Sequence, residues 1–265
     1  MKKERSIAIL GVGNIGSALA KGLLDSKFIT PSSLTLTRRH PDKLSMFKER
    51  GCIVTDQNIE AVQSSQVIVL AVEPHHMEHV LSEISPLLTG QHTLISVATS
   101  WTINKIRNFV NEDVPIVRAM PNTAIAISES MTCLAGPTKH PAMEQTIEMF
   151  KCVGEIQIID EELMTSATAL TACGVAFFLR AIRAAAQGGI EIGFHADQAI
   201  EMAAQTAKGA AELLLQDHQH PEYEIDRVTT PKGCTIAGLN QLEHGGFSSA
   251  MIRGITTSAE KAADL

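Results

Sequence analysis

The fold of this chain is decided by Ser6-Ile7-Ala8-Ile9-Leu10-Gly11-Val12-Gly13-Asn14-Ile15-Gly16, close to its amino terminus. The stretch consists of a short apolar run and a turn with three glycines, and the helical pattern of residues 17–24 follows it. A strand that leads through such a turn into a helix presents unpaired backbone N–H groups at the positive end of the helix dipole. The stretch therefore predicts a βαβ unit with an anion site at its turn.

The three glycines have different physical roles in this arrangement. Gly11 allows the tight turn, Gly13 lets a pyrophosphate approach the backbone, and Gly16 lets the helix pack closely on the strand. Asn14 and Ile15 lie between the second and third glycines of the same turn, whose backbone N–H groups face the anion. We interpret the five residues as dinucleotide contacts. A glycine turn in a fold that has lost its ligand is the alternative.

The end of the second predicted strand, residues 33–37, indicates which dinucleotide binds. An NAD site places an acidic residue about 20 residues beyond the glycines, where it binds the ribose hydroxyls. Here the strand ends in Thr37-Arg38-Arg39, without an acid. A guanidinium matches the oxygens of a 2′-phosphate. The three residues therefore predict NADPH as the cofactor, with NADH as the alternative. A pair of solvated arginines on a loop, without a role in binding, would give the same sequence pattern.

Composition limits the class of protein. The 265 residues are 45% hydrophobic and 19% charged, with a net charge of −7, which argues against nucleic acid and anionic membranes as partners. The five cysteines are scattered, as reduced thiols in a cytosol would be. No stretch reaches the roughly 18 uninterrupted apolar residues of a membrane span. We expect a soluble, cytoplasmic protein.

Strands and helices alternate through the first part of the chain. Strands are predicted at residues 6–10, 33–37, 52–55, 67–72, 93–97, 114–120, 131–135 and 155–159, and helices at 17–24, 42–50, 77–88, 102–110 and 141–151. The alternation predicts a doubly wound α/β sheet with crossover connections, a Rossmann-type dinucleotide-binding domain over residues 1–160. Its ligand would lie beyond the carboxyl ends of the strands. The further cofactor contacts predicted there are Ala71, Val72, Pro74, Ala98, Met120, Pro121 and Asn122.

Residues 161–265 have helical spacing almost throughout, which predicts an all-helical second domain. An apolar stripe runs through Ile200, Ala203, Ala204, Ala207, Ala210, Ala211 and Leu214. Small residues on a stripe let helices approach closely, which favours a dimer; an alanine-rich core within one subunit would look the same. Later in this part, a turn followed by a helix places Thr235 near the first helical residue. Free N–H groups there could hold a carboxylate, although an ordinary capped helix shows the same pattern.

Two histidine clusters, His75-His76-Met77-Glu78-His79 and His218-Gln219-His220, could suggest a metal. Both lack the cysteine or carboxylate geometry of a closed site, and the proposed reaction needs no metal. We interpret them as solvated histidines and expect no metal.

Several of these segments together resemble one family. They are the GVGNIG turn, Met120-Pro121-Asn122-Thr123, residues 169–176, residues 204–211 and, most specific of all, Val228-Thr229-Thr230-Pro231-Lys232-Gly233-Cys234-Thr235-Ile236-Ala237-Gly238-Leu239. In this order and at this spacing they resemble the pyrroline-5-carboxylate reductases, NAD(P)H-dependent enzymes that close proline biosynthesis. The resemblance covers essentially the whole chain.

The resemblance implies hydride transfer to the C=N carbon of 1-pyrroline-5-carboxylate, which gives L-proline. It implies that the Thr235 hydroxyl serves the imine nitrogen as the catalytic group. The N–H groups of Gly233, Cys234 and Thr235 would bind the substrate carboxylate. It further implies a substrate segment at Cys173, Gly174 and Val175, and a homodimer or dimer-based oligomer whose active site is shared between subunits.

This chain departs from the family pattern at several positions. Glu73 stands where the family commonly has lysine, Lys232 where it has glycine, and Ala124 and Val175 where it has proline. A divergent paralogue that reduces another cyclic imine and a cofactor-binding regulator without turnover are therefore alternatives. A β-hydroxyacid dehydrogenase is disfavoured, because residues 174–183 lack the lysine that such enzymes carry on the interdomain helix.

Overall fold

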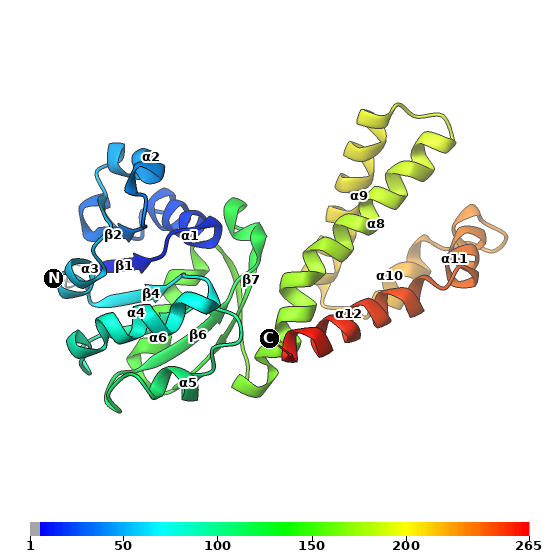
Figure 1. Ribbon diagram of the computed structural model, residues 1–265. Coiled ribbons are helices and arrows are strands. Elements are labelled where there is room, and N and C mark those ends of the chain that lie inside the picture. The colour runs from blue at the N-terminus through cyan, green and yellow to red at the C-terminus, as the bar shows by residue number, and fades with distance from the viewer. Residues whose placement is uncertain (1–5, 265) are drawn as a thin grey trace. The chain divides into compact units, whose positions relative to one another are not determined.

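The computed structural model describes residues 6–264, which form two compact units (Figure 1). Unit 1 comprises the chain up to Ala172 together with the residues from Ala259 onward, and unit 2 comprises Cys173–Ser258. The sequence places a domain boundary after residue 160, where helical spacing begins. Residues 161–172 are helical but pack with the sheet, because Met164 and Ala167 are buried against Met120. The domain 161–265 as a folding unit stays a prediction.

Unit 1 is built on one sheet with the strand order β3-β2-β1-β4-β5-β6-β7-β8. The strands are β1 (Ile7–Leu10), β2 (Leu34–Thr37), β3 (Ile53–Thr55), β4 (Val67–Leu70), β5 (Thr93–Ser96), β6 (Ile116–Met120), β7 (Ser130–Ala135) and β8 (Gly154–Ile158). The first six are parallel, and β1 lies centrally, with Ile7 opposite both Leu34 and Val67. This arrangement confirms the Rossmann-type sheet and all eight predicted strands.

One connection differs from the expected crossovers. β7 runs antiparallel to β6, and β8 is parallel to β7. The link from β6 to β7 is a single short helical turn, η5 (Thr123–Ile127), and no α-helix lies within it. A parallel pair needs a crossover of a dozen or more residues, so this short link reverses the chain. The predicted crossover connections therefore do not extend to the link between β6 and β7.

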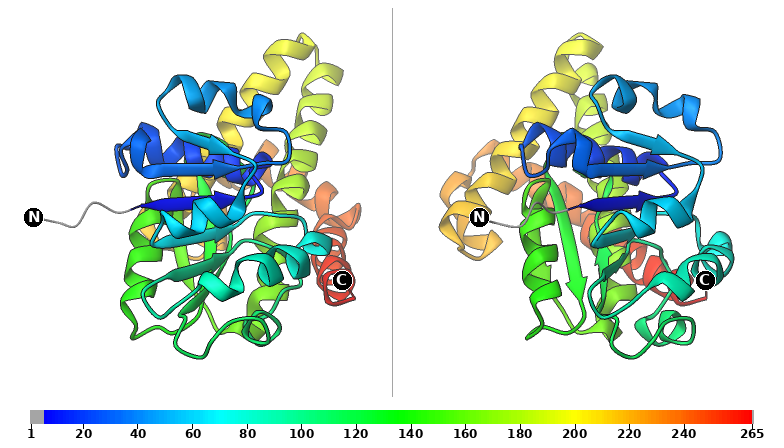
Figure 2. Two further views of the ribbon diagram at one scale, coloured as in Figure 1. Left: turned by 60° about the vertical axis from the view of Figure 1, so that its left-hand side comes forward. Right: turned by 90° about the vertical axis from the view of Figure 1, so that its left-hand side faces the viewer.

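Helices cover both faces of the sheet, as the turned views of Figure 2 show. They are α1 (Asn14–Asp25), α2 (Ser45–Glu49), α3 (Asn58–Gln63), α4 (Met77–Ile84), α5 (Ile103–Arg107), α6 (Pro141–Lys151) and α7 (Met164–Ala167). Alternate strand residues point to opposite faces. Ile7, Ile9 and Val69 accordingly pack with α1 and α6, while Ala8 and Leu70 pack with α3, α4 and α5.

The predicted helices differ from the observed ones mainly in length. Residues 141–151 are helical as predicted, whereas 42–50 divides into the turn η2 (Pro41–Leu44) and α2, and 102–110 shortens to α5. The sequence reading missed α3, which is only six residues long. So short a segment does not span two full turns, and its apolar spacing therefore gives little signal.

Unit 2 is all-helical, as predicted. It contains α8 (Gly174–Glu191), α9 (Ala196–Asp217), α10 (Pro221–Val228), α11 (Cys234–His244) and most of α12 (Phe247–Ala263). α8 packs along α9. A Cβ on Gly189 would lie 3.1 Å from the Cβ of Ala199, so the glycine permits this close approach.

Unit 2 buries almost no large side chain in the single chain. The buried residues in its helices are Gly174, Ala186 and Ala199, whereas Phe178 is 63% exposed and Ile252 61% exposed. Helices without a large buried core are not stabilised by the hydrophobic effect within one chain. Exposed apolar surface of this extent marks an interaction face.

One helical stretch of the described residues, Glu161–Glu191, is long and apolar enough to cross a membrane by length and composition, with a mean hydropathy of 1.5. Polar and charged residues interrupt this stretch, so it contains no uninterrupted apolar run of the length expected for a membrane span. A core helix of a soluble protein meets the same test, so this property is weak evidence for a membrane.

Candidate active site

The five strands β2-β1-β4-β5-β6 are adjacent and parallel, so their carboxyl ends meet at one edge of the sheet. The structure brings the predicted cofactor residues to this edge. They are Gly11, Gly13, Asn14, Ile15 and Gly16 after β1, Thr37, Arg38 and Arg39 at β2, Ala71, Val72 and Pro74 after β4, Ala98 after β5, and Met120, Pro121 and Asn122 at β6. We call it the cofactor edge.

The glycine turn is held against β2 and β4. The N–H groups of Gly11 and Val12 donate to the carbonyl of Thr37 at 3.1 and 2.8 Å. Gly11 has a φ of +79°, and a Cβ there would lie 2.1 Å from Cγ1 of Val72. A side chain at this position would be strained by both the backbone and the contact. The turn consequently requires glycine at position 11.

The start of α1 fits a pyrophosphate. Gly13 is its N-cap, without a side-chain cap, and no acidic residue lies in the first turn. A Cβ on Gly13 would meet nothing within 4 Å, so the space above this glycine is open. A Cβ on Gly16 would lie 3.3 Å from Cγ2 of Ile9, which explains the close packing of helix and strand. An uncapped 12-residue helix with open space at its start is suited to an anion.

Asn58 is a residue of the cofactor edge that the sequence reading missed. The buried Thr37 accepts a hydrogen bond from the N–H of Gly11 at 3.3 Å and donates its hydroxyl to Oδ1 of Asn58 at 2.7 Å. Asn58 in turn donates to Glu83 at 2.9 Å. This chain of bonds fixes the glycine turn to the start of α3. In the sequence, Asn58 could have been noticed only as an asparagine at the start of a helix, which does not indicate a contact with Thr37.

Asn122 is buried, and its polar atoms have partners within the protein. Its backbone N–H donates to Oγ of Ser130 at 3.1 Å, and its Oδ1 accepts from the N–H of Ala124 at 3.0 Å. Its Nδ2 donates to the carbonyl of Thr171 at 3.2 Å. Thr171 belongs to the π-helical segment Thr168–Cys173. Asn122 thus joins the end of β6 to this segment, and a contact with the nicotinamide or its ribose stays a prediction.

The second predicted site lies in unit 2, at the start of α11. Gly233 is the N-cap without a side-chain cap, and Thr235 is the second helical residue, as expected. A Cβ on Gly233 would lie 2.4 Å from Oγ1 of Thr230, so the turn requires this glycine. The N–H of Gly233 already donates to the carbonyl of Thr230 at 2.9 Å. The N–H of Gly233 was expected to bind the substrate carboxylate, but it is already paired within the turn. The N–H groups of Cys234 and Thr235 are the remaining predicted donors to a carboxylate at this helix start.

The turn before α11 carries one strained residue. Lys232 has a φ of +61°, in the left-handed region that favours glycine. The family pattern places glycine here, so this chain accepts a cost of about 1 kcal/mol for a lysine. The lysine is exposed and adds positive charge next to the uncapped helix start. Cys173, Gly174 and Val175, the other predicted substrate residues, form the cap and start of α8.

Glu73, His75 and His76 could each offer one ligand atom to a metal, all within 4.8 Å of one another. Nε2 of His76, however, lies 2.5 Å from Nη2 of Arg39. A guanidinium in that place repels a cation. His218 is the C-cap of α9, His220 is the N-cap of α10, and both are exposed.

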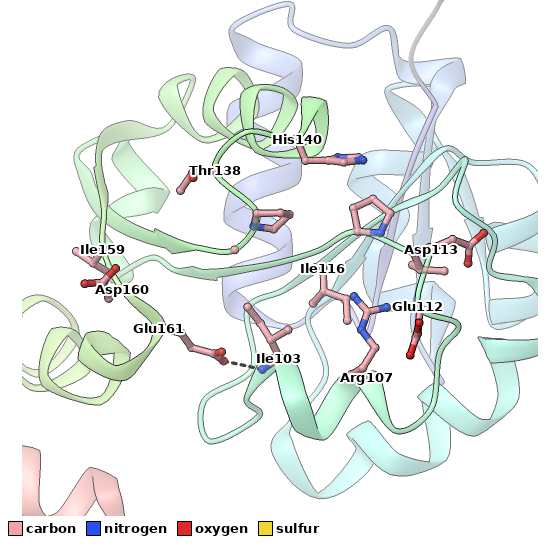
Figure 3. A pocket seen from close by; sticks show the side chains of 14 residues that line it. Ile103, Arg107, Glu112, Asp113, Ile116, Thr138, His140, Ile159, Asp160 and Glu161 are labelled. Atoms are coloured by element: carbon pink, nitrogen blue, oxygen red, sulfur yellow. Dashed lines mark hydrogen bonds between the residues drawn. The ribbon is translucent and has the colours of Figure 1, made fainter.

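A cavity of about 420 Å³ lies at the opposite edge of the sheet, where β6 begins and β7 ends (Figure 3). Several of its charged groups already have partners. Oε1 of Glu161 accepts from the N–H of Ile103 at 2.6 Å and from Nη1 of Arg118 at 3.2 Å. Asp113 accepts from the N–H of Gly90, and Arg107 donates to the carbonyl of Asn111. Through these bonds Glu161 connects the segment after β8 to β6 and to the start of α5.

Replacing Glu161 with alanine is expected to lower the free energy of unfolding by about 3 kcal/mol. The Arg118 side chain is only 7% exposed, and without Glu161 its charge would stay buried and unpaired. Urea unfolding measures the change, with Glu162→Ala as the control at an exposed neighbour. A decrease of less than 1 kcal/mol in the free energy of unfolding of Glu161→Ala would show that the ion pair with Arg118 contributes little to stability.

The sheet topology, the glycine turn and the open helix start define a dinucleotide-binding protein of the Rossmann class with a helical second unit. A family model described as pyrroline-5-carboxylate reductase dimerisation matches residues 161–265. A second one, described as NADP oxidoreductase coenzyme F420-dependent, matches residues 6–100.

Two relatives of high sequence identity carry the same name. Pyrroline-5-carboxylate reductase 2 of Dictyostelium discoideum is 48% identical over 98% of this chain and 93% of its own length. Pyrroline-5-carboxylate reductase 1 of the same organism is 50% identical over 99% of this chain, which spans only half of that relative's length. The crystal structure of Plasmodium falciparum pyrroline carboxylate reductase with NADP bound has a TM-score of 0.87 and 26% identity and covers 97% of each chain. The chain belongs to the pyrroline-5-carboxylate reductase family.

Proposed function

We propose that this chain reduces 1-pyrroline-5-carboxylate to L-proline with NADPH, NADH being the alternative reductant. One observation carries the proposal: both predicted anion sites are helix starts without a side-chain cap and without an acid in the first turn. The start of α1 suits the pyrophosphate of the cofactor, and the start of α11 suits the carboxylate of the substrate. Relatives named for this reaction match over nearly the whole chain.

When bound, the nicotinamide supplies the hydride that reduces the C=N carbon. The protein orients the imine ring of the substrate and balances the charge of the substrate carboxylate. The N–H groups of Cys234 and Thr235 hold the carboxylate at the positive end of α11. The half-buried Thr235 hydroxyl has no hydrogen-bond partner within residues 6–264, so it is free to donate to the imine nitrogen. This donation would stabilise the electron pair that develops on nitrogen as hydride arrives at carbon, and a proton taken up from solvent would complete the amine.

The oligomer in this proposal is a homodimer, or a larger assembly of dimers, formed through unit 2. Its helices leave Phe178, Leu179 and Ile252 about three-fifths exposed in one chain. An apolar groove of about 740 Å³ runs along α8 and α9, lined by Phe178 and by alanines of the predicted stripe. A second copy would cover these side chains, including the apolar stretch Glu161–Glu191. The family model that matches here is named for dimerisation.

The compartment we propose is the cytoplasm. All five cysteines are free thiols in the structure, which suits a reducing environment. The pKa of the buried Cys133 thiol is raised by burial, so this thiol is not an activated nucleophile.

Replacing Phe178 with glutamate is expected to convert the oligomer into monomers at micromolar concentration. A charge placed within an apolar interface is desolvated without a partner. Light scattering after size exclusion measures the mass, with Ile127→Glu as the control. Ile127 is 74% exposed on unit 1, so the same chemical change there should leave the oligomer intact. An unchanged mass for Phe178→Glu would place the contact elsewhere.

The activity itself is tested by NADPH oxidation, followed by absorbance, with pyrroline-5-carboxylate as substrate. Turnover that gives proline supports the proposal. Tight cofactor binding without turnover would indicate a regulatory protein, and turnover only with another cyclic imine would indicate a divergent paralogue.

A further inference from the structure

Two basic side chains, Arg39 and His76, converge at the cofactor edge from opposite sides of β1. Arg39 follows β2, and His76 lies in the turn η3 (Pro74–His76) that follows β4. Strands β2 and β4 are the two neighbours of β1, which Figure 1 shows between them. Nη2 of Arg39 and Nε2 of His76 are nevertheless only 2.5 Å apart. The contact therefore joins the segments that follow β2 and β4, the two strands on either side of β1 and its glycine turn.

The charges around this contact favour an anion. Neither Arg38 nor Arg39 forms a salt bridge with a carboxylate of residues 6–264. The nearby acid, Glu73, faces His75 instead, with 3.4 Å between Oε2 and Nε2. His76 is half-buried, whereas Arg39 is exposed. An arginine that meets an imidazole rather than a carboxylate keeps its charge available to a ligand.

We propose that His76 binds the 2′-phosphate of the cofactor together with Arg39, and so contributes to the preference for NADPH over NADH. The inference rests on the proposed use of NADPH and names a residue for it. The adenosine ribose of a bound dinucleotide lies at the end of the strand next to the glycine turn. A phosphate on its 2′-oxygen would separate the two side chains, and each would donate to its oxygens.

Protonation of His76 is part of this binding. In the free protein its pKa is lowered, first by desolvation and then by the positive charges of His75 and Arg39, with a smaller effect of His79; Glu73 opposes the shift. The ring is therefore neutral at pH 7 and can accept from Arg39. A phosphate dianion beside the ring raises its pKa, so binding takes up a proton. The affinity for NADPH is then highest at low pH and falls as the pH rises above the lowered pKa of the free ring.

The test is direct binding of NADPH and NADH to the whole protein without substrate, measured by calorimetry, for wild type and His76→Gln. Glutamine keeps a hydrogen-bonding group of similar length but cannot carry the charge. We expect the Kd of NADPH to rise about tenfold, as for loss of one charge-assisted hydrogen bond, and the Kd of NADH to change less than twofold. His79→Gln, an exposed neighbour, is the matched control and should change neither value.

The same titrations between pH 6.5 and 8.5 test the proton. The phosphate itself ionises near pH 6, so above that pH its own titration contributes little. The Kd of NADPH should rise with pH in the wild type more steeply than in His76→Gln. Equal losses of NADPH and NADH in the variant, or no loss of either, would overturn the inference. If the wild-type protein binds neither dinucleotide, the proposed function fails as well, which separates the two failures.

Discussion

Replacing Gly13 with aspartate is expected to raise the Kd of NADPH at least a hundredfold while leaving the fold intact. The new carboxylate would occupy the open space at the start of α1 and repel the pyrophosphate, and like charges brought together cost several kcal/mol. Gly13 has a φ of −98°, outside the left-handed region that favours glycine, and a Cβ there would meet no atom within 4 Å. Aspartate is also a better N-cap than glycine, by a few tenths of a kcal/mol. Binding and stability should therefore change in opposite directions.

Fluorescence titration with NADPH and urea unfolding measure the two effects on the same samples. Gly13→Ala is the matched control, because it adds a methyl group without charge and should weaken binding much less. A variant that loses binding and also unfolds more easily would contradict this account. In that case the loss would come from a damaged turn rather than from an occupied anion site.

Replacing Thr235 with alanine is expected to lower kcat for the imine about a hundredfold, with the Kd of NADPH unchanged. The variant removes the hydroxyl that donates to the imine nitrogen, and the loss of one such donor costs about 3 kcal/mol of transition-state stabilisation. The backbone N–H groups that hold the carboxylate remain, so KM should change little. Thr235→Ser keeps the hydroxyl and should restore most of kcat. A serine variant as slow as the alanine variant, or an alanine variant as fast as wild type, would remove the hydroxyl from the mechanism.

The two inactive variants together test whether the site is shared between subunits. Gly13→Asp damages the cofactor site of its own chain, and Thr235→Ala damages the helix start of its own chain. If each site combines one chain's cofactor edge with another chain's α11, a mixed dimer has one intact site. Unfolding and refolding an equimolar mixture should then restore about a quarter of wild-type activity, since half of the dimers are mixed. No recovery, with mixed dimers shown to be present, would place each site within one chain.

Much of the cofactor edge could be predicted from the sequence because its signals are local. The glycine spacing, the apolar strands and the arginines after β2 are read within a few residues each, and parallel strands then bring their ends together. The eight strands and the position of Thr235 in its helix followed from the same kind of pattern. The departures Glu73 and Lys232 were visible too. The sequence could not show that position 232 takes a positive φ, because that angle is fixed by the whole turn.

Other features depend on contacts between residues far apart in the chain. Asn58 and His76 join the cofactor edge through Thr37 and Arg39, across 21 and 37 residues of sequence. Asn122 reaches Thr171, and Glu161 reaches Arg118, across 49 and 43 residues. A hydrogen bond needs a distance and an angle that no pattern of residue types contains.

The sequence by itself determined a Rossmann-type sheet with a nucleotide turn, a helical second part and the family to which they belong. Residue spacing and glycine placement act over single turns and strands, and these are properties of the local chain. The tertiary structure alone decided which polar groups remain free. It showed that Gly233 has already used its N–H, that Asn122 is tied to the π-helical segment, and that an imidazole meets Arg39. Whether a donor is available to a ligand depends on every group packed around it, and only folding brings those groups together.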